Sequence, residues 1–295
     1  MRQNVLLGAL FIVISEFLLA GMSAAIKVLS ASTPEAMLVF FRNFFGLLVL
    51  LPLVARQGVG SLATRVPHLH LLRATAGVAA MYCFFYTIGH MALAEALLFK
   101  LTAPFFIPLV ALLWLGEGIP NTARVAIGVG FVGVAFILQP GSGGLQAVAL
   151  VGLAGALLAG LAKVTIRRMS RSEPATRIVF WFGTLATLIS AVPLTWSWQT
   201  PSAYTLAWLL AMGASATAAQ LLLTRAYALA PAGQLGPFTY VSVVFGALLG
   251  WLFWDEYLDV ATFIGMFLVI TAGILTTRGG RPSPPRSADR EAAHG

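Results

Sequence analysis

The side chains of this chain that could do chemistry are few, and most lie within apolar stretches. All three lysines, Lys27, Lys100 and Lys163, fall inside such stretches, as do Glu16 and Arg42. A charge in hydrocarbon is costly, so an ionisable residue in a membrane segment is a functional candidate by default. If the stretches cross a membrane, these residues predict a site that recognises charge or carries a proton.

Depth along the stretches separates the five residues. Glu16 lies about twelve residues, or roughly 18 Å, into the first stretch, and Lys100 about six residues, or roughly 9 Å, into the fourth. Lys27 and Lys163 lie within about one turn of the ends, where an ammonium group can reach the interface. Three interpretations of Glu16 stay open: a proton carrier, a partner of Arg42 or Lys100, or a protonated carboxyl bonded within the bundle.

Polar, aromatic and proline residues in the same stretches complete the candidate set. Aromatic side chains at helical spacing can line a cavity or simply pack, whereas prolines remove backbone hydrogen bonds and permit bending. The predicted substrate-binding residues are Glu16, Lys27, Arg42, Tyr82, Tyr86, Lys100, Gln220 and Tyr240, and the predicted gating residues are Pro104, Pro108 and Pro237.

The composition requires these stretches to be buried in lipid. The chain is 59% hydrophobic and only 9% charged, whereas soluble domains are roughly a quarter charged. Backbone groups in hydrocarbon must be satisfied within the protein, which leaves helices or a closed barrel. The stretches are continuous and about 20 residues long rather than alternating, so we predict an all-α integral membrane protein.

Turn residues and charges divide the chain into ten stretches, which predict ten transmembrane helices. The first is longer than the roughly 7–15 apolar residues of a signal peptide, so we expect it to remain a membrane helix. The Pro-rich segment 279–295 is expected to form a disordered cytoplasmic tail. The predicted helices are 4–29, 34–54, 70–91, 94–115, 122–139, 145–167, 174–197, 203–228, 231–253 and 259–277.

The sequence repeats itself with a period near half its length. Leu18–Gly21 recurs as Leu157–Gly160, and Glu117 and Glu256 each close an apolar run, with the same offset of 139 in both cases (157 − 18 and 256 − 117). A period of this length, held from both ends, indicates an internal duplication.

Arginines set the expected orientation. Arg65 and Arg73 lie near the connection between helices 2 and 3, and Arg168 near that between helices 6 and 7, whereas the opposite loops lack Lys and Arg. This distribution accounts for the net charge of +8 without a nucleic-acid partner and places both termini in the cytoplasm. Five helices per repeat is an odd number, so we predict two inverted five-helix repeats, residues 1–143 and 144–278.

Several local motifs resemble the EamA-type family of the drug/metabolite transporter superfamily. Helix 4 reads Leu-Thr-Ala-Pro at 101–104 and ends Trp-Leu-Gly-Glu, helix 9 ends Trp-Asp-Glu at 254–256, and helix 2 carries Phe-Phe-Arg-Asn at 40–43. The resemblance covers about residues 5–278 and implies the ten-helix fold and transport, but no particular substrate. In the second repeat Phe182 or a neighbour stands where Arg42 stands, so any role of that arginine exists once per molecule.

The sequence therefore favours a secondary transporter in the cell (inner) membrane. We expect it to export a small polar metabolite or drug by alternating access, rocking one repeat against the other. Energy would come from an ion gradient, with protons as one possibility, because no nucleotide-binding motif occurs. Lys27, Arg42 and Lys100 indicate a substrate with a carboxylate or phosphate, and a zwitterion would add Glu16 as a second contact.

Two alternative functions, a flippase and an intramembrane enzyme, predict different features. A lipid or lipid-carrier flippase of related architecture would open laterally between helices. An intramembrane enzyme would need a nucleophile with a base, yet Ser23 and Ser215 have no membrane-embedded histidine nearby in sequence. The four histidines lack metal-ligand spacing, so we expect no catalytic residue, metal or cofactor. The expected partners are a small-molecule substrate and the lipid bilayer, with the chain as a monomer or homodimer.

Overall fold

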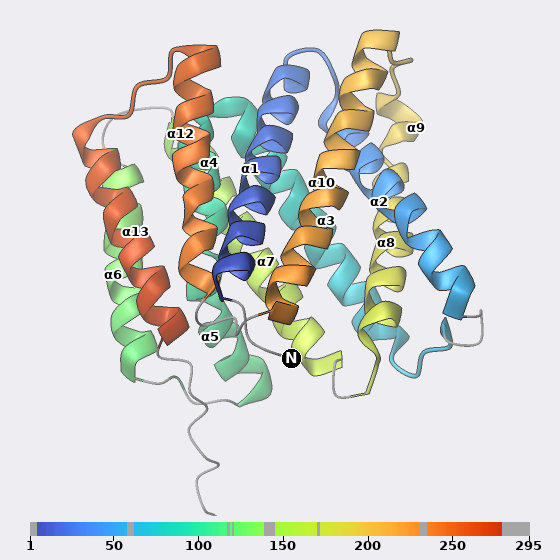
Figure 1. Cartoon of the computed structure of the whole chain (residues 1–295), viewed down its shortest axis with the longest axis horizontal. Helices are drawn as coiled ribbons and strands as arrows, with labels where there is room; N and C mark the ends of the chain where they lie inside the picture. The colour runs from blue at the N-terminus through green and yellow to red at the C-terminus, as the bar shows by residue number, and fades with distance from the viewer. Residues whose placement is uncertain are drawn as a thin grey trace, which may run out of the picture.

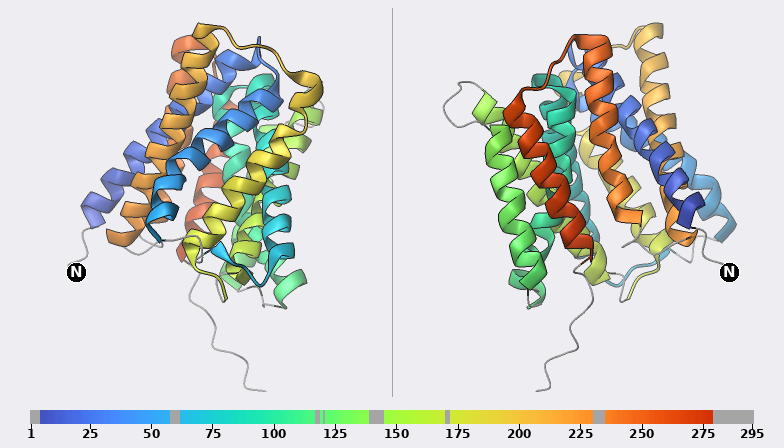
Figure 2. Two further views of the ribbon diagram at one scale, coloured as in Figure 1. Left: turned by 90° about the vertical axis from the view of Figure 1, so that its right-hand side faces the viewer. Right: turned by 60° about the vertical axis from the view of Figure 1, so that its left-hand side comes forward.

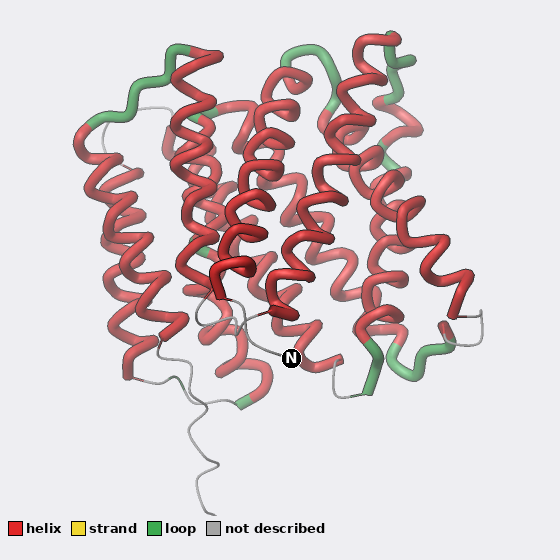
Figure 3. Tube along the Cα trace, in the orientation of Figure 1, coloured by secondary structure: helices red, strands yellow, loops and turns green. Residues whose placement is uncertain are grey.

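Helix is the only regular secondary structure in the part of the chain that this computed structural model describes (Figures 1 and 3). The described residues are 5–57, 62–116, 119, 121–138, 145–169, 172–229 and 235–278, so the predicted tail 279–295 lies outside them. The elements are α1 (Val5–Ser30), α2 (Glu35–Gln57), α3 (Pro67–His90), α4 (Leu93–Leu101), α5 (Ala103–Leu115), α6 (Asn121–Leu138), α7 (Leu145–Met169), α8 (Ala175–Ala191), α9 (Leu194–Ser197), α10 (Ala203–Leu229), the 3₁₀ helix η2 (Gly236–Tyr240), α12 (Val241–Trp254) and α13 (Val260–Arg278).

The helices have the length and surface of a membrane protein. Six helical segments are long and apolar enough to cross a bilayer, and four more apolar helices have 10–17 residues. Large apolar side chains face outward, as at Leu113, which is 86% exposed, and Phe267, which is 70% exposed. A water-facing surface does not carry apolar side chains at this density. The predicted all-helical integral membrane class is therefore confirmed.

Three of the predicted continuous helices are interrupted near prolines. The helix expected over 94–115 breaks at Thr102, so that Pro104 lies in the first turn of α5. The helix expected over 231–253 begins with the 3₁₀ turn that contains Pro237. The helix expected over 174–197 ends at Ala191, and Pro193 precedes the short α9. Proline lacks the N–H that would continue the ladder, which explains all three breaks.

Helices of the two halves pack against each other in matched pairs. The first helix of the chain, α1, packs on α10, and the first helix of the second half, α7, packs on α3 in the corresponding way. The pairs α2 with α8, α4 with α12, and α6 with α13 also join one half to the other. Figure 2 shows α6 and α13 side by side at one edge of the bundle. The halves thus form one interleaved bundle rather than two separate domains.

A close approach of small residues explains the tight α6–α13 pair. A Cβ at Gly133 would meet the Gly265 carbonyl oxygen at 2.9 Å, and a Cβ at Gly265 would collide with the Gly133 carbonyl oxygen. Only glycine lets the two backbones come this close. Gly133 and Gly265 therefore serve packing between two helices of one chain.

The two ends of the bundle differ in composition. Arg65, Arg124, Arg168 and Arg225 lie at or near the end where α1 begins and α7 finishes, which we call the arginine-rich end. The opposite end, where α1 and α12 finish, exposes aromatic side chains that suit a membrane–water interface. These exposed aromatic residues are Trp196, Trp198, Tyr204, Trp251 and Tyr257.

Candidate functional site

Lys27 lies at the opposite end, where it forms an ion pair with Glu256. Its ammonium group donates to the Glu256 carboxylate and, at 2.7 Å, to the Met91 carbonyl oxygen. The second Glu256 oxygen accepts the N–H of Leu93, the first residue of α4, at 2.8 Å. We call Lys27, Met91, Leu93 and Glu256 the Glu256 junction. It joins α1 and α4 of the first half to the end of α12 in the second.

The local backbone explains how Glu256 reaches the first half. Asp255 ends α12 in the left-handed conformation, with φ of 52°, and the Glu256 N–H then bonds the Gly250 carbonyl oxygen at 3.2 Å. The Glu256 carboxylate occupies the space that a side chain at position 250 would need, so this glycine permits the fold-back. Glu117, the repeat counterpart of Glu256, lies outside the described residues.

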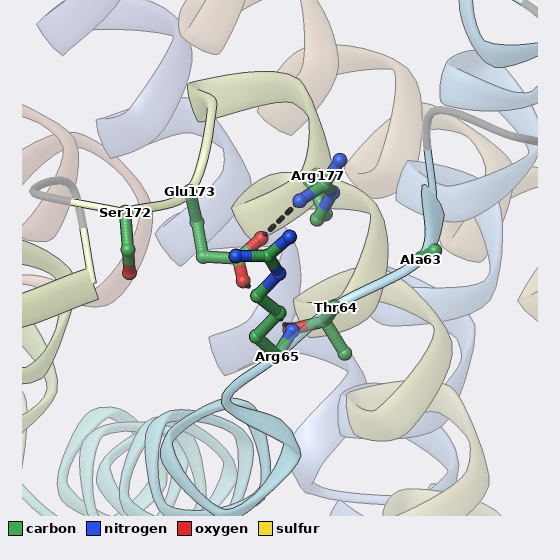
Figure 4. Close-up of a pocket in the computed structure, with 6 residues that line it drawn as sticks. All are labelled: Ala63, Thr64, Arg65, Ser172, Glu173 and Arg177. Carbon is green, nitrogen blue, oxygen red and sulfur yellow. Dashed lines mark hydrogen bonds and ion pairs between the residues drawn. The ribbon is translucent and has the colours of Figure 1, made fainter.

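A second carboxylate joins the two halves at the arginine-rich end. Glu173 accepts hydrogen bonds from the Thr64 hydroxyl at 2.9 Å, the Arg65 N–H at 3.2 Å and the Arg177 guanidinium at 2.7 Å. We call these four residues the Glu173 junction. Figure 4 shows the Glu173 carboxylate pointing toward Arg177, beside a pocket of about 560 Å³. Thr64 and Arg65 precede α3, whereas Glu173 and Arg177 flank the start of α8.

The protonation of Glu173 follows from these bonds. Burial alone would raise the pKa of this carboxyl group, whose side chain is only 1% exposed. The hydrogen bonds from Arg177, Thr64 and Arg65 favour the ionised form and outweigh burial, so the pKa of Glu173 lies below its usual value. No member of the Glu173 junction was predicted as a site residue, because Thr64, Arg65 and Glu173 lie in connections and Arg177 lies in the first turn of α8.

Between the two junctions, the helices bring together four cations that we call the cation cluster: Arg42 of α2, Arg73 of α3, Lys100 of α4 and Lys163 of α7. Arg73 interacts electrostatically with Arg42, and Lys163 interacts with both Lys100 and Arg73. None of the four forms an ion pair with a carboxylate in the described part of the chain. Arg42 and Lys100 were predicted as substrate-binding residues. Arg73 was used only to predict the orientation of the chain in the membrane, and Lys163 was expected to reach the membrane interface.

Aromatic rings and one amide give the cation cluster partial support. The Arg73 guanidinium lies 3.9 Å from the centroid of the Phe182 ring, and the Lys100 ammonium lies 5.4 Å from that of Phe84. Such contacts contribute about 0.5–2 kcal/mol each. Removing a charge from water costs several kcal/mol per ion even after relaxation, roughly twice as much or more. The aromatic contacts therefore do not offset the cost for the partly buried Arg42, Arg73 and Lys100, whereas Lys163 is exposed. All four cations lack an ion-pair partner among the described residues.

Buried donors without acceptors lie at the same place. Arg42 donates to the Asn43 side-chain oxygen at 3.1 Å, which leaves the Asn43 amide nitrogen pointing elsewhere. That nitrogen and the Arg73 Nε are both buried with no hydrogen-bond partner. The Tyr82 hydroxyl is also buried without a partner. An unmade bond at a buried donor costs about 1–3 kcal/mol, so these atoms are suited to an acceptor that the chain does not itself supply.

Glu16 lies close to the cation cluster without a direct bond to it. It is 6% exposed and interacts electrostatically with Lys100. One of the three interpretations of Glu16 required an ion pair with Lys100 or Arg42. The described structure contains no such pair. Next to Glu16, the Ser15 hydroxyl donates to the Ala219 carbonyl oxygen at 2.8 Å and fixes α1 against α10. Glu16 thus remains a candidate for protonation.

The other predicted site residues have mixed surroundings. Tyr86 stacks on His90, with ring centroids 4.0 Å apart, near the opposite end. Tyr240 is 5% exposed and packs directly over Gly273 of α13, which is a packing role. Pro108 lies inside α5. The side chains of Gln220 and Pro237 lie outside the described ones.

Comparison with known proteins identifies the family. The model of the EamA-like transporter family matches the chain twice, over residues 6–139 and 146–278. The chain is 37% identical over 274 residues to the pseudopaline exporter CntI of Pseudomonas aeruginosa strain UCBPP-PA14, covering 92% of this chain and 96% of that protein. It is 29% identical to a riboflavin transporter of Rhizobium johnstonii, over 94% of this chain and 92% of that protein.

The chain is also similar to a more distant transporter and to a solved structure. An S-adenosylmethionine uptake transporter of Rickettsia bellii is 26% identical, over 79% of this chain and 80% of that protein. One solved crystal structure superposes with a TM-score of 0.61 at 18% identity, covering 94% of this chain and 98% of that chain. At that identity the superposition shows the shared fold alone.

Proposed function

The chain belongs to the EamA-like transporter family, and from this premise we propose that it is a secondary exporter of a small polar metabolite. The six long and four shorter apolar helices would form ten membrane crossings in two inverted repeats, residues 1–143 and 144–278. Both termini would lie in the cytoplasm of a cell (inner) membrane, because the arginine-rich end is expected to face that side. The opposite end would then face outward.

One observation carries this proposal: an unneutralised cation cluster lies between two junctions that each tie one repeat to the other. A transporter working by alternating access needs a site near the middle and a closure on each side of it. The Glu256 junction would close the outer side and the Glu173 junction the inner side. The breaks at Thr102 and at Gly236–Tyr240 interrupt the helices beside them, which supports bending there.

The direction of transport is taken from the relatives. The pseudopaline exporter is 37% identical to this chain, whereas the S-adenosylmethionine uptake transporter is 26% identical. The greater similarity to an exporter favours export. Glu16 would carry the coupling proton, because it is buried beside Lys100 and free to bind or release a proton when the surroundings change.

Efflux from proteoliposomes tests the proposal. Liposomes containing the purified protein, and empty liposomes, would be loaded with a mixture of anionic, zwitterionic and cationic metabolites. The metabolites released across an imposed proton gradient would then be identified by mass spectrometry. We expect one chemical class to leave faster through the protein, with the proton-driven part lost in Glu16→Gln. Release indistinguishable from empty liposomes for every metabolite would contradict the proposal.

A further inference from the structure

We infer that the cation cluster, together with Asn43, binds a small water-soluble substrate that carries at least two anionic groups, carboxylates or phosphates. The inference rests on the proposed export function and adds the charge of the cargo. It follows from the number of unpaired cations, their spacing across the membrane and the buried donors beside them.

The spacing of the cations sets the number of anionic groups. Arg42 and Lys100 lie roughly 10 Å along their helices from the opposite end, whereas Arg73 and Lys163 lie roughly 9 Å from the arginine-rich end. The cluster therefore spans the middle of the bundle as two pairs. A substrate with a single anionic group would neutralise one pair and leave the other without counter-charge.

The donors at this place match the oxygen atoms of such groups. Asn43 is 3% exposed, and its amide nitrogen lacks an acceptor, as does the Arg73 Nε. Guanidinium and amide donors bind carboxylate or phosphate oxygens with short, charge-assisted bonds. One anionic group beside Arg42 and a second beside Arg73 would supply the acceptors that these two nitrogens lack.

A purely structural role would require acidic partners. Glu16 interacts electrostatically with Lys100, and no described carboxylate forms an ion pair with any of the four cations. One carboxylate leaves most of four positive charges unneutralised. Structural ion pairs elsewhere in the molecule are complete, as between Lys27 and Glu256. The cation cluster thus differs from a set of structural ion pairs, in which each cation has a carboxylate partner.

Depth distinguishes a soluble cargo from a lipid headgroup. Lipid phosphates lie in the headgroup layer, outside a hydrocarbon core of about 30 Å. The four cations lie roughly 9–10 Å inside their helices, at the level of the hydrocarbon. We therefore commit to a soluble polyanion.

Binding of small probes to the purified full-length protein tests the charge requirement. Succinate and citrate would be compared with acetate, which has one charge, and with succinamide, the neutral diamide of the same size as succinate. We expect citrate and succinate to raise the unfolding temperature, acetate to bind at least tenfold more weakly, and succinamide to have no effect. Equal stabilisation by succinate and succinamide, or no stabilisation by any probe, would overturn the inference.

Two substitutions separate binding from bracing. Arg73→Gln and Lys163→Gln should each weaken citrate binding at least tenfold. Arg168→Gln is the matched control, since Arg168 lies in the last turn of α7 against the Trp114 ring and outside the cation cluster; there the change should stay within twofold. Because an unpaired cation repels its neighbours, both cluster variants should unfold at the same or a higher temperature without ligand. A lower unfolding temperature together with unchanged citrate binding would overturn the inference.

Two further measurements, citrate binding in nanodiscs of different lipids and export by the variants, separate a soluble cargo from a lipid. Citrate binding should be the same in nanodiscs of phosphatidylcholine and of phosphatidylglycerol. Competition by phosphatidylglycerol that disappears in Lys163→Gln would overturn the inference in favour of a lipid headgroup. Export of a neutral or cationic metabolite at full rate by both variants would overturn it and leave the proposed function intact. Cluster-dependent citrate binding by a protein that exports nothing would instead contradict the proposed function.

Discussion

The two junctions that tie the repeats together are built from different bonds. At the Glu256 junction the cation, Lys27, belongs to the other repeat, 229 positions away. At the Glu173 junction the cation, Arg177, lies four residues further along the same segment, and among the described contacts of Glu173 the other repeat contributes the Thr64 hydroxyl and the Arg65 N–H. Opening the first separates two opposite charges, whereas opening the second leaves the ion pair intact.

This difference indicates which end opens more readily. Removing one partner of a fully buried ion pair costs about 3–5 kcal/mol, and we discount this to about 2 kcal/mol here because the Lys27 and Glu256 side chains are 13% and 18% exposed. At the Glu173 junction the charge of Glu173 stays paired when the repeats separate. The arginine-rich end should therefore open at a lower cost than the opposite end.

The largest effect is expected when the charge at the opposite end is removed. Glu256→Gln leaves Lys27 without a counter-charge, so the opposite end should open more often. Labelling of Ser23→Cys, one turn from Lys27 and 0% exposed, would report this in a Cys83→Ser background with an impermeant maleimide. We expect a reaction about 30-fold faster, since about 2 kcal/mol is lost and each 1.4 kcal/mol is worth about tenfold.

The neighbouring acid provides the control for that experiment. Asp255 is exposed and ends α12, so Asp255→Asn removes the same charge without touching Lys27, and asparagine tolerates the left-handed backbone there. Labelling should then stay at the level of the unchanged protein. Equal acceleration by both substitutions would mean that the Glu256 junction has no special part in closing this end.

Double-mutant cycles should give a smaller but more specific difference. Lys27→Met combined with Glu256→Gln should show a coupling energy of about 1–2 kcal/mol, and Thr64→Val with Glu173→Gln about 0.5–1 kcal/mol. Equilibrium unfolding of the purified variants in detergent measures both. The comparison fails if the Thr64–Glu173 coupling is the larger one.

Acid should weaken the Glu173 junction. The pKa of Glu173 is lower in the folded protein than its usual value, so its contribution to stability is fully present above that usual value, 4.5. The contribution is lost as the pH falls through the lower, folded value, because protonation then removes the acceptor of three hydrogen bonds. Unfolding temperatures measured between about pH 7 and pH 3 should fall less steeply for Glu173→Gln than for the unchanged protein. If the unfolding temperatures of the two proteins fall equally with pH, protonation of Glu173 does not contribute to the acid sensitivity.

The smallest effect concerns the ring beside Lys27. The Lys27 ammonium lies 5.5 Å from the centroid of the Trp254 ring. Trp254→Leu keeps an apolar side chain but removes this contact, at a cost of about 0.5–1 kcal/mol. The unfolding free energy should fall by that amount, and by no more than a few tenths when Lys27→Met is already present. A full loss in both backgrounds would show that Trp254 acts through packing alone.

The helical class and the duplication could be predicted from the sequence because each depends on local pattern. Ten apolar stretches require helices in lipid, and Pro104, Pro237 and Pro193 mark the breaks that the structure contains. Local pattern does not give the exact position of each break, because the helices over 94–115 and 174–197 were predicted to be continuous. The break at Thr102 comes two residues before the proline that explains it.

The site was harder to predict because charge partners are set by tertiary contacts. Lys27 and Lys100 both lie in apolar stretches, yet Lys27 forms an ion pair with Glu256, 229 positions away, and Lys100 forms no ion pair with a described carboxylate. Arg73 was predicted to lie just inside helix 3 and was used only for orientation, but it lies about six residues inside α3, and that depth was the signal that could have found it. Glu173 carried no such signal, because a carboxylate in a connection is ordinary.

The matched packing of the two repeats has a consequence for how such proteins diversify. Gene duplication supplied paired helices, with α1 on α10 answered by α7 on α3, whereas the position of Arg42 in the first repeat is filled by Phe182 or a neighbour in the second. The helical framework is thus repeated, whereas three of the four cluster cations, Arg42, Arg73 and Lys100, come from the first half and only Lys163 from the second. On the proposed mechanism, substitutions at these few positions can alter the cargo without changing the paired helices, so selectivity and mechanics can evolve along separate paths.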